Sequence, residues 1–354
     1  MSFPVNQITK NKKIMDDQKR VENFLQDFSR QLSQRVGGDL DFILLFGSAA
    51  RGEWQRGISD IDLIIQTKNI KSKEKVFKEA EKIFWELDKK HETKFNEACS
   101  IKEKKEAIDH ILEKTKLYVP FQVFGPGDIE WSKSEIKEKS LILGAKLFAS
   151  QAMIFKNMKY EGKILYGRDI TREIQFKATL WEKIKALMIP FYIAFSSIFF
   201  SLIFPKSALK LADKSVIYSI GSTFFFLDKI GKKNLKENIK ELEKEVHGFF
   251  NLRANIFIAA ELDFLLNFAY QNFLDLKFLR DAINIKYNWQ EENKKFNRWK
   301  IFKFCLKSLI FVNSMNWYSI LRADKQRIFF KIFFALRTLI LVFLICFLFY
   351  YLIK

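Results

Sequence analysis

The chain has little proline, glycine or cysteine for its length. Its 354 residues include 5 Pro, 13 Gly and 3 Cys. Because proline and glycine interrupt regular helices, their scarcity favours helices over most of the chain. The cysteines, Cys99, Cys305 and Cys346, lie far apart in the sequence. The sequence therefore indicates neither a disulfide framework nor a zinc site, which fits a reducing compartment.

The amino-terminal segment lacks a long apolar run, and the chain has fewer acidic than basic residues. The segment MSFPVNQITKNKK lacks the apolar core of a secretory signal. Acidic residues are outnumbered, since 60 Lys and Arg stand against 41 Asp and Glu and the formal net charge is +19. This excess predicts a polyanionic partner. Composition alone leaves open whether that partner is a nucleic acid, an anionic lipid membrane or a nucleotide.

The stretch from Phe42 to Gln66 carries the densest set of chemically informative residues. An apolar run ends at Gly47-Ser48, and a polar segment then leads to Asp60-Ile61-Asp62 and a second apolar run. This pattern predicts a strand, a turn that opens a short helix, a loop and a second strand. Period-two geometry places Asp60 and Asp62 on one face of the second strand. Two carboxylates that close repel each other unless a cation lies between them, and oxygen ligands suit Mg²⁺.

The turn after the first strand is the predicted phosphate-binding element. Gly47 allows the backbone to approach a ligand closely, and Ser48 adds a hydroxyl beside the first N–H groups of a helix. Arg51 lies one turn into that helix, where it could reach a triphosphate or pair with Glu53 or another acid. Both interpretations of Arg51 stay open at this stage.

The motif GSAARGE followed by SDIDL resembles the signature of the polymerase-beta-like nucleotidyltransferase superfamily, especially its minimal bacterial and archaeal members. The resemblance is carried by about 25 residues and extends over roughly 100. It implies an α/β nucleotidyltransferase fold, with a short mixed sheet flanked by helices. It also implies an NTP donor, which we expect to be ATP, and two Mg²⁺ ions, or Mn²⁺ in their place.

The resemblance further implies a third carboxylate, because catalysis in this superfamily uses two metal ions. We predict a third strand over residues 93–99, after a helix over residues 72–90, and Glu97 is the candidate acid. The alternative is an exposed glutamate at a strand edge. A second candidate strand, residues 117–124, has Gln122 at its centre instead of an acid. Without a third acid the chain could bind a nucleotide and not turn it over.

The rest of the chain is predicted to be mainly α-helical, with a carboxy-terminal transmembrane helix. A short strand and turn is expected within residues 162–170. The Arg-x4-His motif of the ribonuclease domains that often accompany minimal nucleotidyltransferases is absent from the sequence. The predicted parts are a helix packing on the sheet (1–36), the nucleotidyltransferase domain (37–135), a helical domain (136–290), a basic juxtamembrane segment (291–331) and a transmembrane tail anchor (332–353).

Two apolar stretches raise the question of a membrane. Residues 186–205 carry no charge and could span a bilayer or form a buried helix. Residues 332–353 contain one charge, Arg337, and follow a segment rich in Lys and Arg. The positive-inside rule places that segment and the catalytic domain in the cytoplasm if only the tail spans the membrane. We therefore interpret 186–205 as buried and 332–353 as a single-pass anchor, beside which the basic segment contacts anionic lipid.

Together these observations predict a membrane-anchored, Mg²⁺-dependent nucleotidyltransferase. Asp60, Asp62 and Glu97 would bind the metal ions, and Gly47, Ser48 and Arg51 would bind the nucleotide. The acceptor is a hydroxyl of a protein, a small molecule or an RNA end. One alternative is a non-catalytic nucleotide sensor or scaffold at the membrane. Another is an RNA-binding module, since aromatic residues are interleaved with the basic ones.

Overall fold

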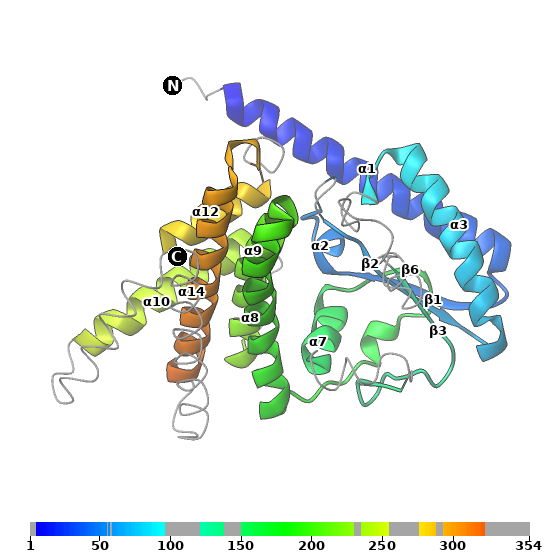
Figure 1. Ribbon diagram of the computed structural model, residues 1–354. Coiled ribbons are helices and arrows are strands. Elements are labelled where there is room, and N and C mark those ends of the chain that lie inside the picture. The colour runs from blue at the N-terminus through cyan, green and yellow to red at the C-terminus, as the bar shows by residue number, and fades with distance from the viewer. Residues whose placement is uncertain are drawn as a thin grey trace. The chain divides into compact units, whose positions relative to one another are not determined.

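The structure of the protein is a computed structural model that describes most of the chain. The chain divides into two compact units. The units are residues Met1–Lys185 and Ala186–Lys354. The described residues are 5–54, 56, 59–95, 121–137, 150–229, 235–254, 276–287 and 293–322 (Figure 1).

The first unit is built on a four-stranded mixed sheet. Its strands are ordered β3-β2-β1-β6. The central strand β1 pairs antiparallel with both β2 and β6, and β2 pairs parallel with β3. The bounds are β1 Leu40–Phe46, β2 Asp62–Thr67, β3 Phe121–Phe124 and β6 Lys163–Gly167. This confirms the predicted short mixed sheet.

Helices cover both faces of this sheet because side chains alternate along each strand. On β2, Leu63 and Ile65 point into one core with α1 and α3, whereas Ile64 points into the other core with α7. Figure 1 shows these helices beside the sheet. The helices of this unit are α1 Val5–Val36, α2 Gly47–Ala50, α3 Lys73–His91 and α7 Gln151–Glu161, with the 3-10 turns η1 Ile70–Ser72 and η2 Ile170–Arg172. A two-stranded hairpin, β4 Ile129–Glu130 and β5 Glu135–Ile136, lies beyond β3 in the chain.

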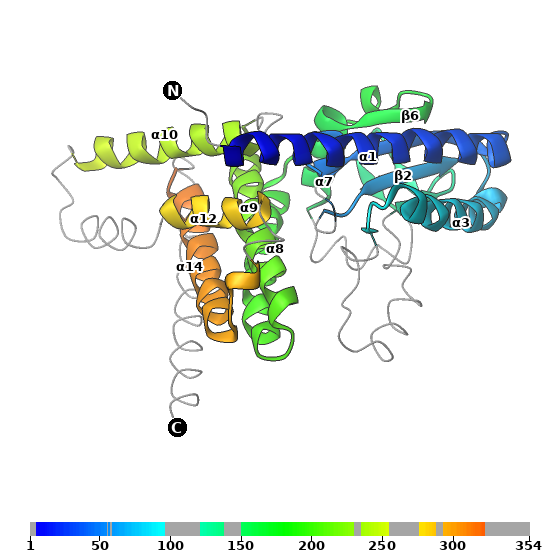
Figure 2. The ribbon, with the colours of Figure 1, turned by 90° about the horizontal axis from the view of Figure 1, so that it is seen from above.

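The second unit is helical in its described residues, as predicted. Helices α8, α9 and α14 run side by side, and α9 and α14 share the most extensive helix–helix contact in the described structure (Figure 2). The elements are α8 Leu180–Ile203, which begins before the division between the units, α9 Pro205–Phe226, α10 Leu235–Ala254, α12 Leu276–Tyr287, η3 Asn293–Lys295 and α14 Arg298–Arg322.

Two sequence predictions differ from the structure of the first unit. The strand predicted over residues 93–99 is not formed at 93–95, where the chain leaves α3 and buries Phe95 in the core; residues 96–99 lie outside the described part. The strand beside β2 is β3, inside the second candidate stretch. The predicted domain boundary at residue 135 also differs, because β6 completes the sheet and the first unit continues to Lys185.

The membrane predictions concern one described helix and one stretch that the structure does not describe. Within them, one helix, α8, is long and apolar enough to cross a bilayer, and 44% of its most apolar window is buried. We predicted a buried helix here, yet Phe199, Leu202 and Ile203 are 47%, 55% and 64% exposed. The predicted tail anchor at 332–353 lies outside the described residues.

Candidate active site

The pairing register of β1 and β2 brings the two sequence motifs together. Phe46, the last residue of β1, is opposite Asp62, the first residue of β2. Gly47 and Ser48 follow Phe46 directly and open α2, so the Gly-Ser turn and the aspartate pair meet at one end of the sheet. Gly47, Ser48, Asp60 and Asp62 are all partly exposed. The structure therefore places four of the six predicted site residues in one accessible spot.

Gly47 is required at this place for two reasons. Its φ is +74°, a conformation that side chains rarely tolerate. A Cβ at this position would lie 2.1 Å from Oδ2 of Asp62, well inside contact distance. The missing side chain thus lets the Asp62 carboxylate lie directly against the backbone of the turn, so a cation held by this carboxylate would be next to a phosphate held by the turn.

The direction of the Asp62 side chain follows from the burial of its two neighbours. Ile61 and Leu63 are 1% and 2% exposed and lie in the core formed with α1 and α3. Asp62 lies between them at the start of β2, so its side chain faces the opposite side of the sheet, which α7 covers. Asp60 precedes the strand, and its place on the same face stays a prediction.

Arg51 joins two carboxylates beside this turn. Its Nε donates to Glu53 at 3.0 Å, and its Nη1 donates to Glu161 at the end of α7 at 2.6 Å. Burial acts to lower the pKa of Arg51, but Glu161 and Glu53 outweigh it and the pKa is raised. The guanidinium therefore stays charged and ties α2 to α7. This is the pairing alternative for Arg51; its contact with a phosphate stays a prediction.

The loop between Arg51 and Asp60 is held by a buried tryptophan that the sequence analysis did not single out. Trp54 is 1% exposed, and its Nε1 donates to the carbonyl of Ser59 at 3.1 Å. Its own carbonyl accepts from Gln18 of α1 at 2.7 Å, and its ring meets Phe95 edge-on at 5.5 Å. The sequence signal that could have indicated this role is the occurrence of a single large apolar residue, a tryptophan, in an otherwise polar, glycine-containing loop. Its contacts set where Asp60 enters the site.

Asp60 and Asp62 are the described groups that could hold a divalent cation. They offer carboxylate oxygens, the ligands that Mg²⁺ prefers, and the Asp62 carboxylate lies against the Gly47 backbone. Among the described residues, no cluster of three His, Cys, Asp or Glu could complete a metal site. Glu97 lies outside them. On β3, Gln122 stands opposite Ile64, so the strand beside the aspartates presents an amide at that position.

Comparison with known proteins gives two findings. Residues 25–120 match the nucleotidyltransferase domain family. Over 54 residues the chain is 43% identical to a protein of Methanocaldococcus jannaschii that is named as a candidate protein adenylyltransferase. The matched segment covers 15% of this chain and 36% of that protein, so the match spans about a third of the relative. No solved structure matches the chain.

Proposed function

We propose that the chain transfers the nucleotidyl group of an NTP to a hydroxyl acceptor, because residues 25–120 match the nucleotidyltransferase domain family. The observation that carries the proposal is the meeting of Gly47 and Asp62 across the β1–β2 register. The name of the M. jannaschii relative supports ATP as the donor and a protein hydroxyl as the acceptor. A small molecule or an RNA end are the other acceptor classes.

In the proposed reaction, the acceptor oxygen bonds to the α-phosphorus and the bond to the bridging oxygen breaks. Pyrophosphate leaves with that electron pair, and a site carboxylate or water takes the hydroxyl proton. Gly47 and Ser48 hold the β- and γ-phosphates through backbone N–H groups and a hydroxyl. Asp60 and Asp62, with Glu97 as the proposed third acid, would hold two Mg²⁺ or Mn²⁺ ions. When bound, these ions would stabilise the attacking and leaving oxygens.

The test compares the full chain with its Asp60→Asn, Asp62→Asn double variant. Each is incubated with α-³²P-labelled NTPs, Mg²⁺ or Mn²⁺, and cell extract as the source of acceptor. We expect label on an acceptor with the natural chain and a loss of at least a hundredfold in the variant. A control variant, Asp169→Asn with Asp228→Asn, removes two carboxylates from other positions and should keep full activity.

The second candidate function is a nucleotide sensor without turnover; the observation in its favour is that β3 places the amide of Gln122, and not an acid, opposite Ile64 of β2. It predicts metal-dependent nucleotide binding that is lost in the double variant, and no transfer with either chain. Glu97→Gln separates the two cases, because only the enzyme needs a third carboxylate. Neither label transfer nor metal-dependent nucleotide binding with the natural chain would overturn both functions.

We also propose that the chain is anchored by residues 332–353, with the nucleotidyltransferase domain in the cytoplasm. Support comes from the apolar composition of this stretch and the Lys and Arg residues that precede it. Fractionation of cells that express the full chain or a chain ending at residue 325 tests this. The full chain should stay with the membranes after a high-salt wash, and the shorter chain should be released.

A further inference from the structure

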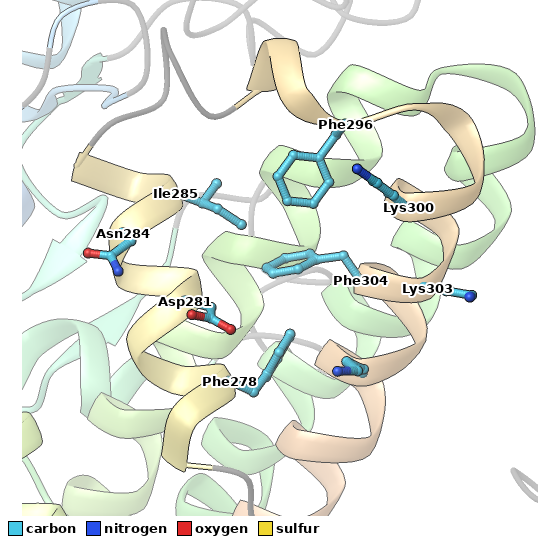
Figure 3. A pocket seen from close by; sticks show the side chains of 9 residues that line it. Phe278, Asp281, Asn284, Ile285, Phe296, Lys300, Lys303 and Phe304 are labelled. Atoms are coloured by element: carbon cyan, nitrogen blue, oxygen red, sulfur yellow. The ribbon is translucent and has the colours of Figure 1, made fainter.

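The second unit contains an open pocket of about 520 Å³ between α12 and α14 (Figure 3). Its floor is aromatic, because Phe304 of α14 packs against Phe278 of α12, with ring centroids 4.9 Å apart. Phe296, which precedes α14, meets the same ring edge-on at 6.0 Å. Ile285 extends this apolar floor along α12. The pocket can therefore receive an apolar group without burying an unpaired polar one.

The rim of the pocket on α14 is positively charged. Lys300, Lys303 and Lys307 follow one another at helical spacing, are exposed and line the pocket. Within the described part of the chain, none of the three makes an ion pair, and Lys303 Nζ lies 5.1 Å from the centre of the Trp299 ring. Asp281 is the one carboxylate in the lining. The pocket thus has an excess of positive charge over an apolar floor.

Two contacts between α9 and α14 show which ends of the helices in the second unit lie together. Cys305 Sγ lies 3.8 Å from the carbonyl oxygen of Ala208, and Ser319 Oγ donates to Thr223 Oγ1 at 3.1 Å, so α9 and α14 run parallel. The lysine-bearing half of α14 is therefore beside the start of α9, which directly follows the end of α8.

At this end Leu202 and Ile203 of α8 are 55% and 64% exposed, and Trp299 of α14 is 54% exposed. The lysine rim and a patch of exposed apolar side chains thus belong to one region. Exposed aromatic and aliphatic side chains next to lysines are characteristic of a surface that meets the lipid–water interface.

We propose that the pocket between α12 and α14 binds the phosphate ester of an anionic phospholipid headgroup. Lys300 and Lys307 neutralise the phosphate, and Lys303, whose side chain extends from the outer side of α14 (Figure 3), adds positive charge at the rim. The floor of Phe278, Phe296 and Phe304 takes the glycerol backbone and the first acyl carbons. Basic pockets between transmembrane helices bind anionic lipid headgroups in a comparable way. The site is separate from nucleotidyl transfer and needs neither NTP nor Asp60 and Asp62, so either proposal can fail alone.

The test uses the full chain in a neutral maltoside detergent, so that the predicted tail anchor does not dominate the result. Binding of dioctanoyl phosphatidylglycerol is measured by native mass spectrometry, beside dioctanoyl phosphatidylcholine and inorganic phosphate. The pocket variant is Lys300→Gln, Lys303→Gln, Lys307→Gln. A matched variant, Lys206→Gln, Lys240→Gln, Lys244→Gln, removes the same charge from exposed positions of the same unit that do not line the pocket.

We expect phosphatidylglycerol to bind at least tenfold more weakly to the pocket variant than to the matched variant. Phe296→Ser keeps every charge and should weaken phosphatidylglycerol binding at least threefold relative to the natural chain. This variant tests the pocket even if the triple variant does not fold. Equal weakening in both triple variants would show diffuse attraction and overturn the proposal. So would phosphatidylcholine binding as tightly as phosphatidylglycerol, or inorganic phosphate competing at equal concentration.

Discussion

At the scale of single residues, the candidate site depends on a glycine and on a paired arginine. Gly47 adopts a turn conformation that side chains disfavour, and its lack of a side chain lets the Asp62 carboxylate lie against the backbone. Arg51 holds that turn to the end of α7 through Glu161. The motif identified both residues, but it did not reveal that Glu161 lies beside them. A contact across 110 positions of the chain depends on the packing of α7 against the sheet.

Replacing Gly47 tests whether its contact with Asp62 matters for the site, and Gly52 nearby in the sequence supplies the control. Gly52 has the same φ of +74°, but a Cβ there would meet nothing within 4 Å. Gly47→Ala and Gly52→Ala should therefore cost similar backbone strain, about 1 kcal/mol each. Only Gly47→Ala displaces the Asp62 carboxylate, so it should lower nucleotide binding or transfer at least tenfold more than Gly52→Ala does. Thermal melting measures the strain, and equal losses of activity would contradict the proposed role of the close contact between Gly47 and Asp62.

At the scale of elements, α1 and α3 are joined by a charged cluster around Asp27. Its Oδ2 accepts from Lys90 at 2.6 Å and from His91 at 3.0 Å, and Arg30 donates to its Oδ1. Hydrogen bonding from Lys90 is the main reason that the pKa of Asp27 lies below its ordinary value of 3.8; His91 adds to this and burial opposes it. The carboxylate therefore stabilises the packed helix pair while it is ionised.

Asp27→Asn should lower the free energy of unfolding by about 1 kcal/mol at pH 7. Because the folded-state pKa is lowered, this contribution is complete above about pH 4 and is lost as the pH falls through the folded-state pKa. Urea unfolding of the natural chain and the variant at pH 7 and at pH 3 measures the difference. Glu74→Gln, in an exposed pair on α3, should have almost no effect. A difference that persists unchanged at pH 3 would contradict the assignment.

At the scale of the whole molecule, the sheet requires residues far beyond the motif. Strand β6 covers one edge of β1, and Phe155 and Met158 of α7 bury the face that carries Phe42 and Leu44. The sequence boundary at residue 135 would remove both elements. The short strand within residues 162–170 could be predicted from its own residues. Its pairing with β1 could not be predicted, because the composition of a strand does not identify the strand with which it pairs.

Two fragments test where the first unit ends. A fragment of residues 1–185 should unfold cooperatively in urea, because it retains β6 and α7. A fragment of residues 1–150 should aggregate or unfold without a sharp transition, since an apolar face and a strand edge are uncovered. Circular dichroism during the titration and size-exclusion chromatography measure both properties. A cooperative transition in the shorter fragment would show that the first unit folds without α7 and β6, as the predicted boundary at residue 135 implies.

The sequence by itself determined the parts of this protein that rest on local chemistry. The Gly-Ser turn, the Asp60–Asp62 spacing and the strand alternation between them depend on residue type and period, so they could be predicted without the fold. Tertiary structure decided which elements meet. It paired Arg51 with Glu161, buried Trp54 against Phe95, and put Gln122 of β3 beside β2 in place of the expected strand at 93–99. These outcomes depend on contacts between segments distant in sequence, and such contacts leave little trace in the residues of either segment alone.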